Sequence, residues 1–92
     1  PQGSSVYVRG PDGLEIALFH VQGNFFALNN ACPHQGGPLA EGELHDYCIT
    51  CPWHAWDFDI RTGECLNYPG EDAQKIPIIL KEGAIYLEYE PS

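Results

Sequence analysis

The sequence CPHQGGPLAEGELHDYCITCPWH, residues 32–54, decides the fold of this chain. It opens with Cys32 and His34 in a C-x-H spacing, and after 16 intervening residues it closes with Cys51 and His54 in a C-x-x-H spacing. Each pair offers one thiolate and one imidazole, which are side chains that bind zinc and iron-sulfur clusters. Two short loops with matched ligand sets indicate two halves of one metal site, and the rest of the chain is expected to be their scaffold.

Length and charge limit the possible functions. The 92 residues are expected to form one domain, 1–92, with a thin core, because a chain of this size hides only roughly 60 to 65% of its unfolded surface. The net charge of −9 comes from 4 basic and 13 acidic residues spread along the chain. An acidic surface repels phosphate, which argues against a nucleic-acid partner. A basic protein partner fits this charge, and so does a general contribution to solubility.

Neither a membrane span nor a signal peptide is visible. No apolar run approaches the ~20 residues that a membrane helix needs, so we expect no membrane association. We expect a soluble, cytoplasmic protein. Four cysteines in so short a chain also occur in secreted disulfide frameworks. Two of them, however, stand in cysteine–histidine pairs, which is typical of metal ligands in a reducing compartment.

Short apolar runs with a two-residue period, separated by turn-forming residues, predict an all-β fold. About eight to ten short strands are typical of a small antiparallel sandwich or barrel. The expected strands cover residues 6–9, 14–21, 25–28, 43–44, 47–50, 55–60, 65–66, 75–81 and 84–89. The first three form a meander with a hairpin turn at Gly23 and Asn24, Gly63 turns the chain in left-handed backbone, and a single helical turn is expected near 71–74.

Two kinds of metal centre fit the ligands. A tetrahedral zinc site takes two thiolates and two imidazoles, but zinc fingers usually place two cysteines together and two histidines together. In a two-iron cluster with cysteines on one iron and histidines on the other, each mixed loop contributes one ligand to each iron. The mixed order therefore favours an iron-sulfur cluster over zinc.

These motifs resemble those of the Rieske iron-sulfur proteins. The resemblance covers the four ligands at both spacings and the phrases CPHQGGPLAEGEL and CPWHAWDFDIRTGEC, about a third of the chain. It implies one 2Fe-2S cluster per chain, with Cys32 and Cys51 on the inner iron and His34 and His54 on the outer, more exposed iron. It also implies a Rieske-like fold whose cluster-binding subdomain, about 31–69, is formed by two loops.

The resemblance also bears on the reduction potential. Two neutral imidazoles in place of two thiolates leave the oxidised centre uncharged, so it accepts an electron more easily than a four-cysteine cluster. High-potential members, those of the cytochrome bc complexes, have a disulfide at the positions of Gly37 and Trp53, and hydroxyls at those of Trp56 and Phe58. The absence of these groups implies a low-potential, ferredoxin-type centre. Ala55 stands where the family commonly has glycine; if its φ is positive, alanine costs about 1 kcal/mol without loss of ligation.

The remaining cysteines and histidines have plainer interpretations. Cys48 stands in a C-x-x-C spacing with Cys51, but a buried strand cysteine fits it better than a redox residue or an alternative ligand, and the same holds for Cys65. A disulfide between the two is the less favoured alternative. His20 and His45 are expected to be ordinary strand or loop residues.

Three further features have two interpretations each. Trp53, between two ligands, shields the cluster from water or packs against a docking partner. Asp57 and Asp59 look like a pair of catalytic carboxylates, but a solvated strand face is the better interpretation. Pro69-Gly70 is a plain turn or, by resemblance, a third loop that covers the cluster.

The leading hypothesis is electron transfer by a carrier that is not itself an enzyme, since no substrate pocket or nucleophile with a base is visible. The resemblance implies the ferredoxin component that moves one electron from a flavin-containing reductase to the terminal oxygenase of an aromatic-ring dioxygenase or related monooxygenase, through His34 and His54. One alternative is a subunit or domain of a larger oxidoreductase, such as the small subunit of a nitrite reductase or the Rieske domain of an oxygenase. Another is a structural zinc module.

Overall fold

The chain is built from three small antiparallel sheets. The computed structural model describes residues 3–33, 36–53 and 55–87. Its sheets contain strands β1 to β3, β4 to β6, and β7 with β8. Over these residues the helical elements are two three-residue 3-10 turns, Pro11–Gly13 and Leu39–Glu41, so the all-β prediction is confirmed. None of the described segments is a helix long and apolar enough to cross a membrane.

The first sheet is the expected meander. It consists of β1 (Gly3–Arg9), β2 (Glu15–Val21) and β3 (Asn24–Asn29), in that spatial order. The β2–β3 turn lies on Gln22 and Gly23, whose φ angles of 51° and 83° suit a two-residue hairpin turn. The prediction of a Gly23-Asn24 turn is therefore wrong by one residue, because Asn24 already pairs with Val21 in the ladder.

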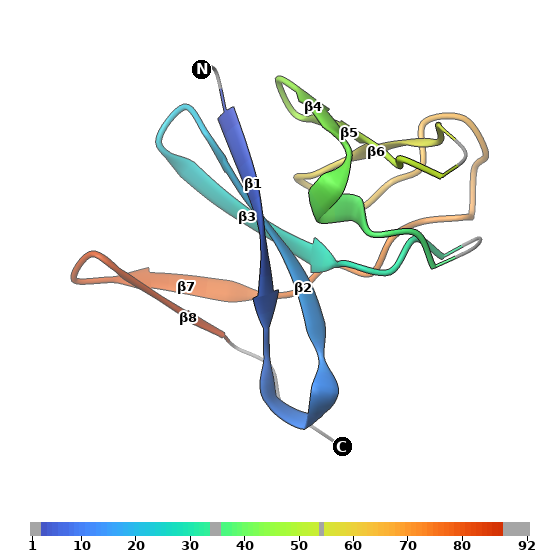
Figure 1. Cartoon of the computed structure of the whole chain (residues 1–92). Coiled ribbons are helices and arrows are strands. Elements are labelled where there is room, and N and C mark those ends of the chain that lie inside the picture. The colour runs from blue at the N-terminus through green and yellow to red at the C-terminus, as the bar shows by residue number, and fades with distance from the viewer. Residues whose placement is uncertain (1–2, 34–35, 54, 88–92) are drawn as a thin grey trace.

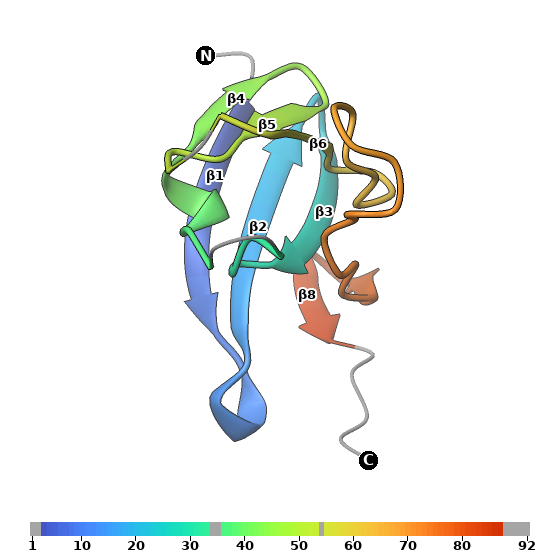
Figure 2. The same cartoon turned by 90° about the vertical axis from the view of Figure 1, so that its right-hand side faces the viewer.

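Both faces of β2 carry buried apolar side chains, and each face contacts a different core. Ala17, Phe19 and Val21 belong to the larger core, which extends to the β4–β6 sheet and the cysteine loops. Ile16 belongs to a smaller core with Ile76, next to the β7–β8 hairpin. Figures 1 and 2 show these two neighbours against the β1–β3 sheet, which thus serves as the common base of the domain.

The second sheet carries the end of the ligand stretch. It consists of β4 (Glu43–His45), β5 (Cys48–Thr50) and β6 (Asp57–Asp59). The strand expected over 55–60 is shorter than predicted, because Ala55 has a φ of 60° that no strand residue adopts. The predicted alternation is nevertheless confirmed, since Phe58 and Ile60 are both fully buried.

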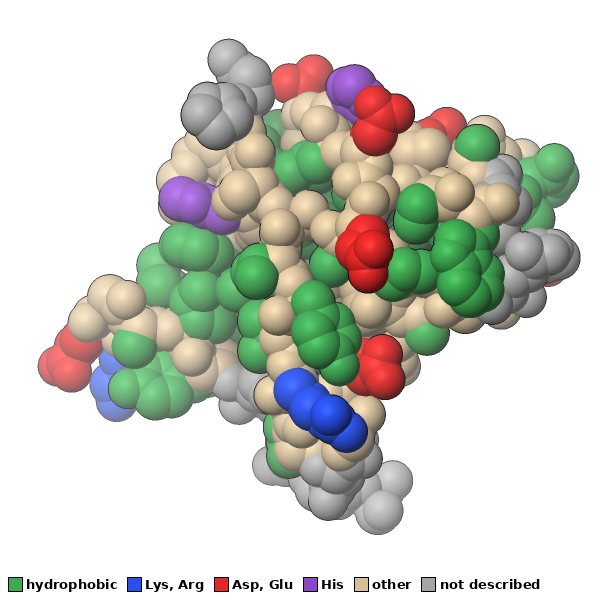
Figure 3. Space-filling view, in the orientation of Figure 1, with side chains coloured by type: hydrophobic (Ala, Val, Ile, Leu, Met, Phe, Trp, Pro, Cys, Tyr) green, Lys and Arg blue, Asp and Glu red, His purple; other side chains and the backbone are tan. Residues whose placement is uncertain are grey.

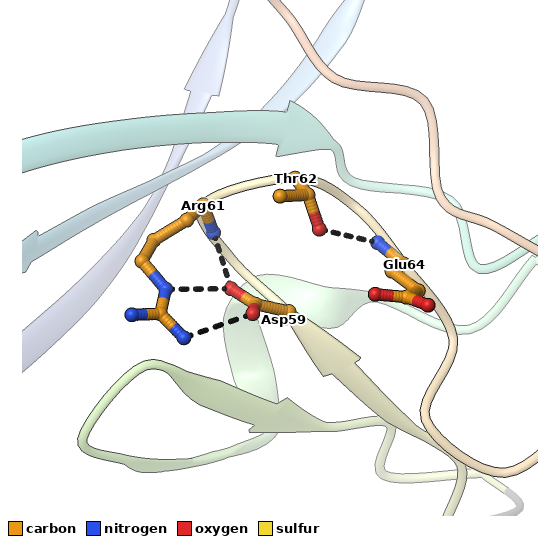
Figure 4. A network of polar contacts seen from close by, with 4 residues as sticks. All are labelled: Asp59, Arg61, Thr62 and Glu64. Atoms are coloured by element: carbon orange, nitrogen blue, oxygen red, sulfur yellow. Dashed lines mark hydrogen bonds and ion pairs between the residues drawn. The ribbon is translucent and has the colours of Figure 1, made fainter.

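The turn after β6 is held by a polar network (Figure 4). Arg61 donates two side-chain hydrogen bonds of 3.0 Å to the carboxylate of Asp59, and its guanidinium lies 4.5 Å from the centroid of the Tyr47 ring. Gly63 has the predicted left-handed backbone, with a φ of 87°. Asp59 is half-buried and bonded, so the prediction of a solvated carboxylate is wrong at this position.

This ion pair makes the turn sensitive to acid. The hydrogen bonds from the Arg61 side chain hold the pKa of Asp59 below its usual value. A carboxylate with a lowered pKa stabilises the fold above its unfolded pKa of about 4, and that contribution is lost as the pH falls through the lowered value. The turn is therefore anchored at neutral pH.

The C-terminal part differs most from the prediction. β7 (Ile78–Lys81) begins only after Pro77, which cannot donate to a ladder, and β8 (Ala84–Leu87) follows a turn at residues 82–83. Cys65 makes only an isolated bridge to Phe58 instead of a strand over 65–66. The helical turn expected near 71–74 is absent from this described segment. Residues 88–89 of the last expected strand lie outside the described residues.

Candidate metal centre

Cys32 and Cys51, two of the four expected ligands, begin loops with the same hydrogen-bond pattern. In each loop the cysteine amide donates to the carbonyl five residues later, over 2.9 Å at Cys32 and 2.8 Å at Cys51. In each, the cysteine carbonyl accepts from the amide four residues later, over 2.7 Å at Cys32 and 3.0 Å at Cys51. A proline follows each cysteine and restricts φ there. The two loops are therefore two copies of one backbone frame.

The ends of the two cysteine loops are also joined at equivalent positions. A β-bridge joins the residue before the cysteine to the sixth residue after it, which is Ala31 with Pro38 in the first loop and Thr50 with Asp57 in the second. The second closure is reinforced because the Thr50 hydroxyl donates to the Asp57 carboxylate over 2.6 Å. Asp57 is thus a structural residue of the loop, and the prediction that it is merely solvated is wrong.

Asn30, which the sequence analysis did not single out, anchors the first loop to the base sheet. It is only 5% exposed. Its backbone N–H donates to the Glu15 carbonyl over 2.8 Å, and its side-chain oxygen accepts from the backbone N–H of Ala40 over 2.8 Å. Its carbonyl accepts from the Leu39 amide over 2.8 Å. A buried amide that satisfies backbone groups on both sides of a loop fixes where that loop begins and ends.

The fifth residue of each loop has left-handed backbone. Gly36 has a φ of 76°, and Ala55, at the matched position, has a φ of 60°. Ala55 therefore has the positive φ angle on which its predicted strain depended. Glycine adopts this conformation without the steric cost that alanine pays through its Cβ atom.

Replacing Ala55 by glycine is expected to stabilise the folded chain by about 1 kcal/mol, because the strain at φ 60° is removed. The measurement is the free energy of unfolding from thermal or denaturant melting of the loaded protein. Ala40→Gly, at a half-buried alanine without positive φ, is the matched control and should destabilise. A loss of stability in Ala55→Gly would show that the alanine methyl makes contacts worth more than the strain.

Gly37 brings the two loops into direct contact. A Cβ atom added at this position would lie 2.9 Å from the Sγ atom of Cys51 and 2.9 Å from Cγ of Trp53. No real Cβ atom approaches its neighbours so closely, so the first loop packs on the second through the bare backbone of this glycine. This close contact between the two loops is the structural role of Gly37.

The four cysteines divide into two kinds. Cys32 and Cys51, at 2% and 1% exposure, are buried at the start of the loops. Cys48 is half-buried in β5, and Cys65 is buried beside Phe58. None of the four is in a disulfide, so the less favoured bond between Cys48 and Cys65 is absent. Burial, together with the charges of Asp57 and Asp59, raises the pKa of the Cys48 thiol.

The other candidate residues lie as follows. His34 and His54 fall outside the described residues. His20 is exposed and stacks on Phe25 with ring centroids 4.2 Å apart, and His45 is exposed in β4, as expected of ordinary histidines. Among the described residues no group of three or more histidine, cysteine or acidic side chains is placed to hold a metal ion.

Two aromatic side chains flank the second loop. Trp53 is 60% exposed although one edge of its indole covers Gly37, so it both covers the junction of the loops and presents a surface to solvent. The ring of Tyr68 lies 4.5 Å from that of Trp56, which brings the loop containing Pro69-Gly70 against the second cysteine loop. The loop containing Pro69-Gly70 is thus more than a plain turn, because it packs against the second cysteine loop.

This arrangement fits a cluster with two cysteine ligands. Two buried thiol donors stand at equivalent positions of equivalent loops, and a glycine without a side chain holds the loops together. A 2Fe-2S cluster with mixed ligands needs one thiolate from each of two loops on the same iron. The internal signal for this frame was present in the sequence as a repeated Cys-Pro-x-x-small pattern, residues 32–36 and 51–55.

Comparison with known proteins identifies the family of this arrangement. The family model described as the Rieske [2Fe-2S] domain matches residues 3–81. The chain is 41% identical over 75 residues to the ferredoxin subunit of the 3-phenylpropionate/cinnamic acid dioxygenase of Photorhabdus laumondii, covering 79% of this chain and 71% of that protein. It is 35% identical over 89 residues to the ferredoxin component of the p-cumate 2,3-dioxygenase system of Pseudomonas putida, covering 95% and 75%.

A solved structure extends this similarity to the fold. The structure titled as a complex of reduced oxygenase and oxidized ferredoxin in carbazole 1,9a-dioxygenase contains a chain that matches with a TM-score of 0.85 and 27% identity, over 95% of this chain and 90% of that one. The expected Rieske-like fold is therefore confirmed, and the family match favours an iron-sulfur cluster over the zinc alternative.

Proposed function

This chain belongs to the Rieske 2Fe-2S domain family, and on that premise we propose that it is a one-electron carrier whose cluster is bound by Cys32, His34, Cys51 and His54. The observation that carries the proposal is the pair of loops with the same backbone hydrogen-bond pattern, each beginning with a buried cysteine. We place the cluster-binding part at about 31–69 of a single domain, 1–92. His34 and His54 are assigned from their positions in the two motifs.

The residues around the cysteines fit electron transfer. A bound 2Fe-2S cluster supplies a centre that accepts and releases one electron. Burial of Cys32 and Cys51 keeps water from the thiolate side, where hydrolysis or oxidation would release the metal. Phe58, which is fully buried in the same core as both cysteines, offers a ring without a hydroxyl. Fewer donors near the cluster support a low reduction potential.

The names of the relatives support a place in a multicomponent system. Both reported relatives are ferredoxin components of dioxygenases, and the matching solved structure is a complex of a ferredoxin with its oxygenase. We therefore propose that this chain accepts an electron from a flavin-containing reductase and delivers it to a terminal oxygenase. A cytoplasmic location suits this function, because the ligand thiolates need a reducing compartment. The relatives support this carrier over the alternative of a nitrite reductase subunit or an oxygenase domain.

The proposal is tested by spectroscopy followed by a coupled assay. The purified chain should be red-brown and contain about two iron and two sulfide ions per chain. A flavin-containing reductase of a dioxygenase system should bleach its visible absorption with NADH, and a terminal oxygenase should restore it. A colourless protein that contains zinc would contradict the cluster, and a cluster that no such reductase reduces would contradict the carrier function.

A further inference from the structure

A groove runs beside the second cysteine loop. Its volume is about 470 Å³, and its lining includes Glu41, Glu43, Cys51, Pro52 and Trp53. Glu41 ends the second 3-10 turn and Glu43 begins β4, so both residues belong to short secondary-structure elements. The groove thus combines an apolar wall, two acidic side chains and one of the proposed cluster ligands.

The acidic charge of the groove is not neutralised by the chain itself. All four basic residues of the chain are described, and none of them lines the groove: they are Arg9, Arg61, Lys75 and Lys81. Arg61 is paired with Asp59. Among the described residues, the ion-pair contact of Glu43 is with His45, whose Nε2 atom lies 3.9 Å from its carboxylate with both side chains largely exposed, and Glu41 has no ion pair. On the face seen in Figure 3, the visible Lys and Arg side chains lie away from the β4–β6 sheet.

Trp53 provides the other half of a site for a cation. It is 60% exposed, so much of its indole is available to a partner, while its inner edge is fixed against Gly37. The faces of an indole ring attract a guanidinium or ammonium group, and the ring also packs against the aliphatic stem of arginine or lysine. Carboxylates and an exposed indole in one groove therefore match one kind of side chain, which is basic and long.

We propose that this groove binds an arginine or lysine side chain of the terminal oxygenase. The inference rests on the proposed function, which supplies the oxygenase as the electron acceptor. The cation would lie between the carboxylates of Glu41 and Glu43, with its stem over Trp53. Because Cys51 forms part of the same groove, a partner held there is held within contact distance of a ligand of the cluster. Charge complementarity in such a contact acts mainly on the rate of association.

The experiment uses the loaded full chain and the terminal oxygenases of the 3-phenylpropionate and p-cumate dioxygenase systems as probes. The second-order rate of oxygenase reduction is measured by stopped flow over a range of ionic strength for the double variant Glu41→Gln/Glu43→Gln. We expect a fall of about three- to tenfold at low salt, which shrinks as salt screens the wild-type attraction. Trp53→Leu should lower the rate at high salt as well, because its contact is not screened.

The matched control is Glu15→Gln/Glu82→Gln, which removes the same charge from exposed side chains at other sites on the surface. Visible absorption and the reduction potential of each variant establish that the cluster itself is unchanged. If the control loses as much rate as the groove variant, or the groove variant loses none, the groove assignment is overturned while the carrier function stands. If the wild-type chain reduces neither oxygenase, the proposed function fails and the groove assignment falls with it.

Discussion

Replacing Cys51 by serine should abolish cluster assembly, whereas replacing Cys48 by serine should leave it intact. The two cysteines stand three positions apart in C-I-T-C, and the sequence favours Cys51 as the ligand because it belongs to the C-x-x-H pair. The structure separates them, because Cys51 begins the matched loop with its thiol 1% exposed and Cys48 is a half-buried strand residue paired with Asp59. We expect cluster content to fall more than about tenfold in Cys51→Ser, since removing a ligand costs at least as much as removing a group that orients one.

Cluster loss should also lower stability. A domain of this size has a thin core, and the free energy of binding a metal centre adds to the free energy of folding. Iron and sulfide analysis with visible absorption gives the cluster content, and thermal melting gives the stability of each variant. Cys65→Ser, at a second buried cysteine, is the control for burial alone. Intact clusters in Cys51→Ser, or their loss in Cys48→Ser, would contradict the assignment of ligands.

The candidate ligand residues could be proposed from the sequence because motif spacing is a property of the sequence itself. Cysteine and histidine at C-x-H and C-x-x-H spacings indicate loops that each offer one thiolate and one imidazole, whatever the fold around them. The flanking phrases indicated the family. The burial of Phe58 and Ile60 was equally readable, since a two-residue period with apolar residues on one face reports burial directly.

Other features depend on contacts between segments far apart in the chain. Asn30 gives no signal of its own as an anchor, because its partners on β2 and beyond the first loop become neighbours only after folding. The carboxylates of Asp57 and Asp59 alternate with apolar residues and so suggested a solvated face. Thr50 and Arg61, which bond them, reveal their role only through the hairpin register and the turn that follows. Local periodicity cannot show which polar groups find partners.

Gly37→Ala is expected to disrupt the centre far more than Gly36→Ala, although the two glycines are adjacent. At Gly36 the φ of 76° strains an alanine, but a Cβ atom there would meet nothing within 4 Å, so the cost is about 1 kcal/mol of backbone strain. The native chain tolerates this arrangement at Ala55, the matched position of the other loop. At Gly37 the backbone is unstrained, but a Cβ atom would lie 2.9 Å from Sγ of Cys51.

Something must therefore move in Gly37→Ala, and the two candidates are the thiol of Cys51 and the indole of Trp53. Overpacking of this kind costs about 1 to 3 kcal/mol, and displacement of a ligand should lower cluster content several-fold. Cluster content and the reduction potential are measured for Gly37→Ala, Gly36→Ala and the double variant Gly37→Ala/Trp53→Ala. If removing the indole restores the cluster, Trp53 is the group that clashes; if it does not, the methyl displaces Cys51 itself. Equal cluster content in Gly36→Ala and Gly37→Ala would contradict the close packing of the two loops, because backbone strain alone would then account for both variants.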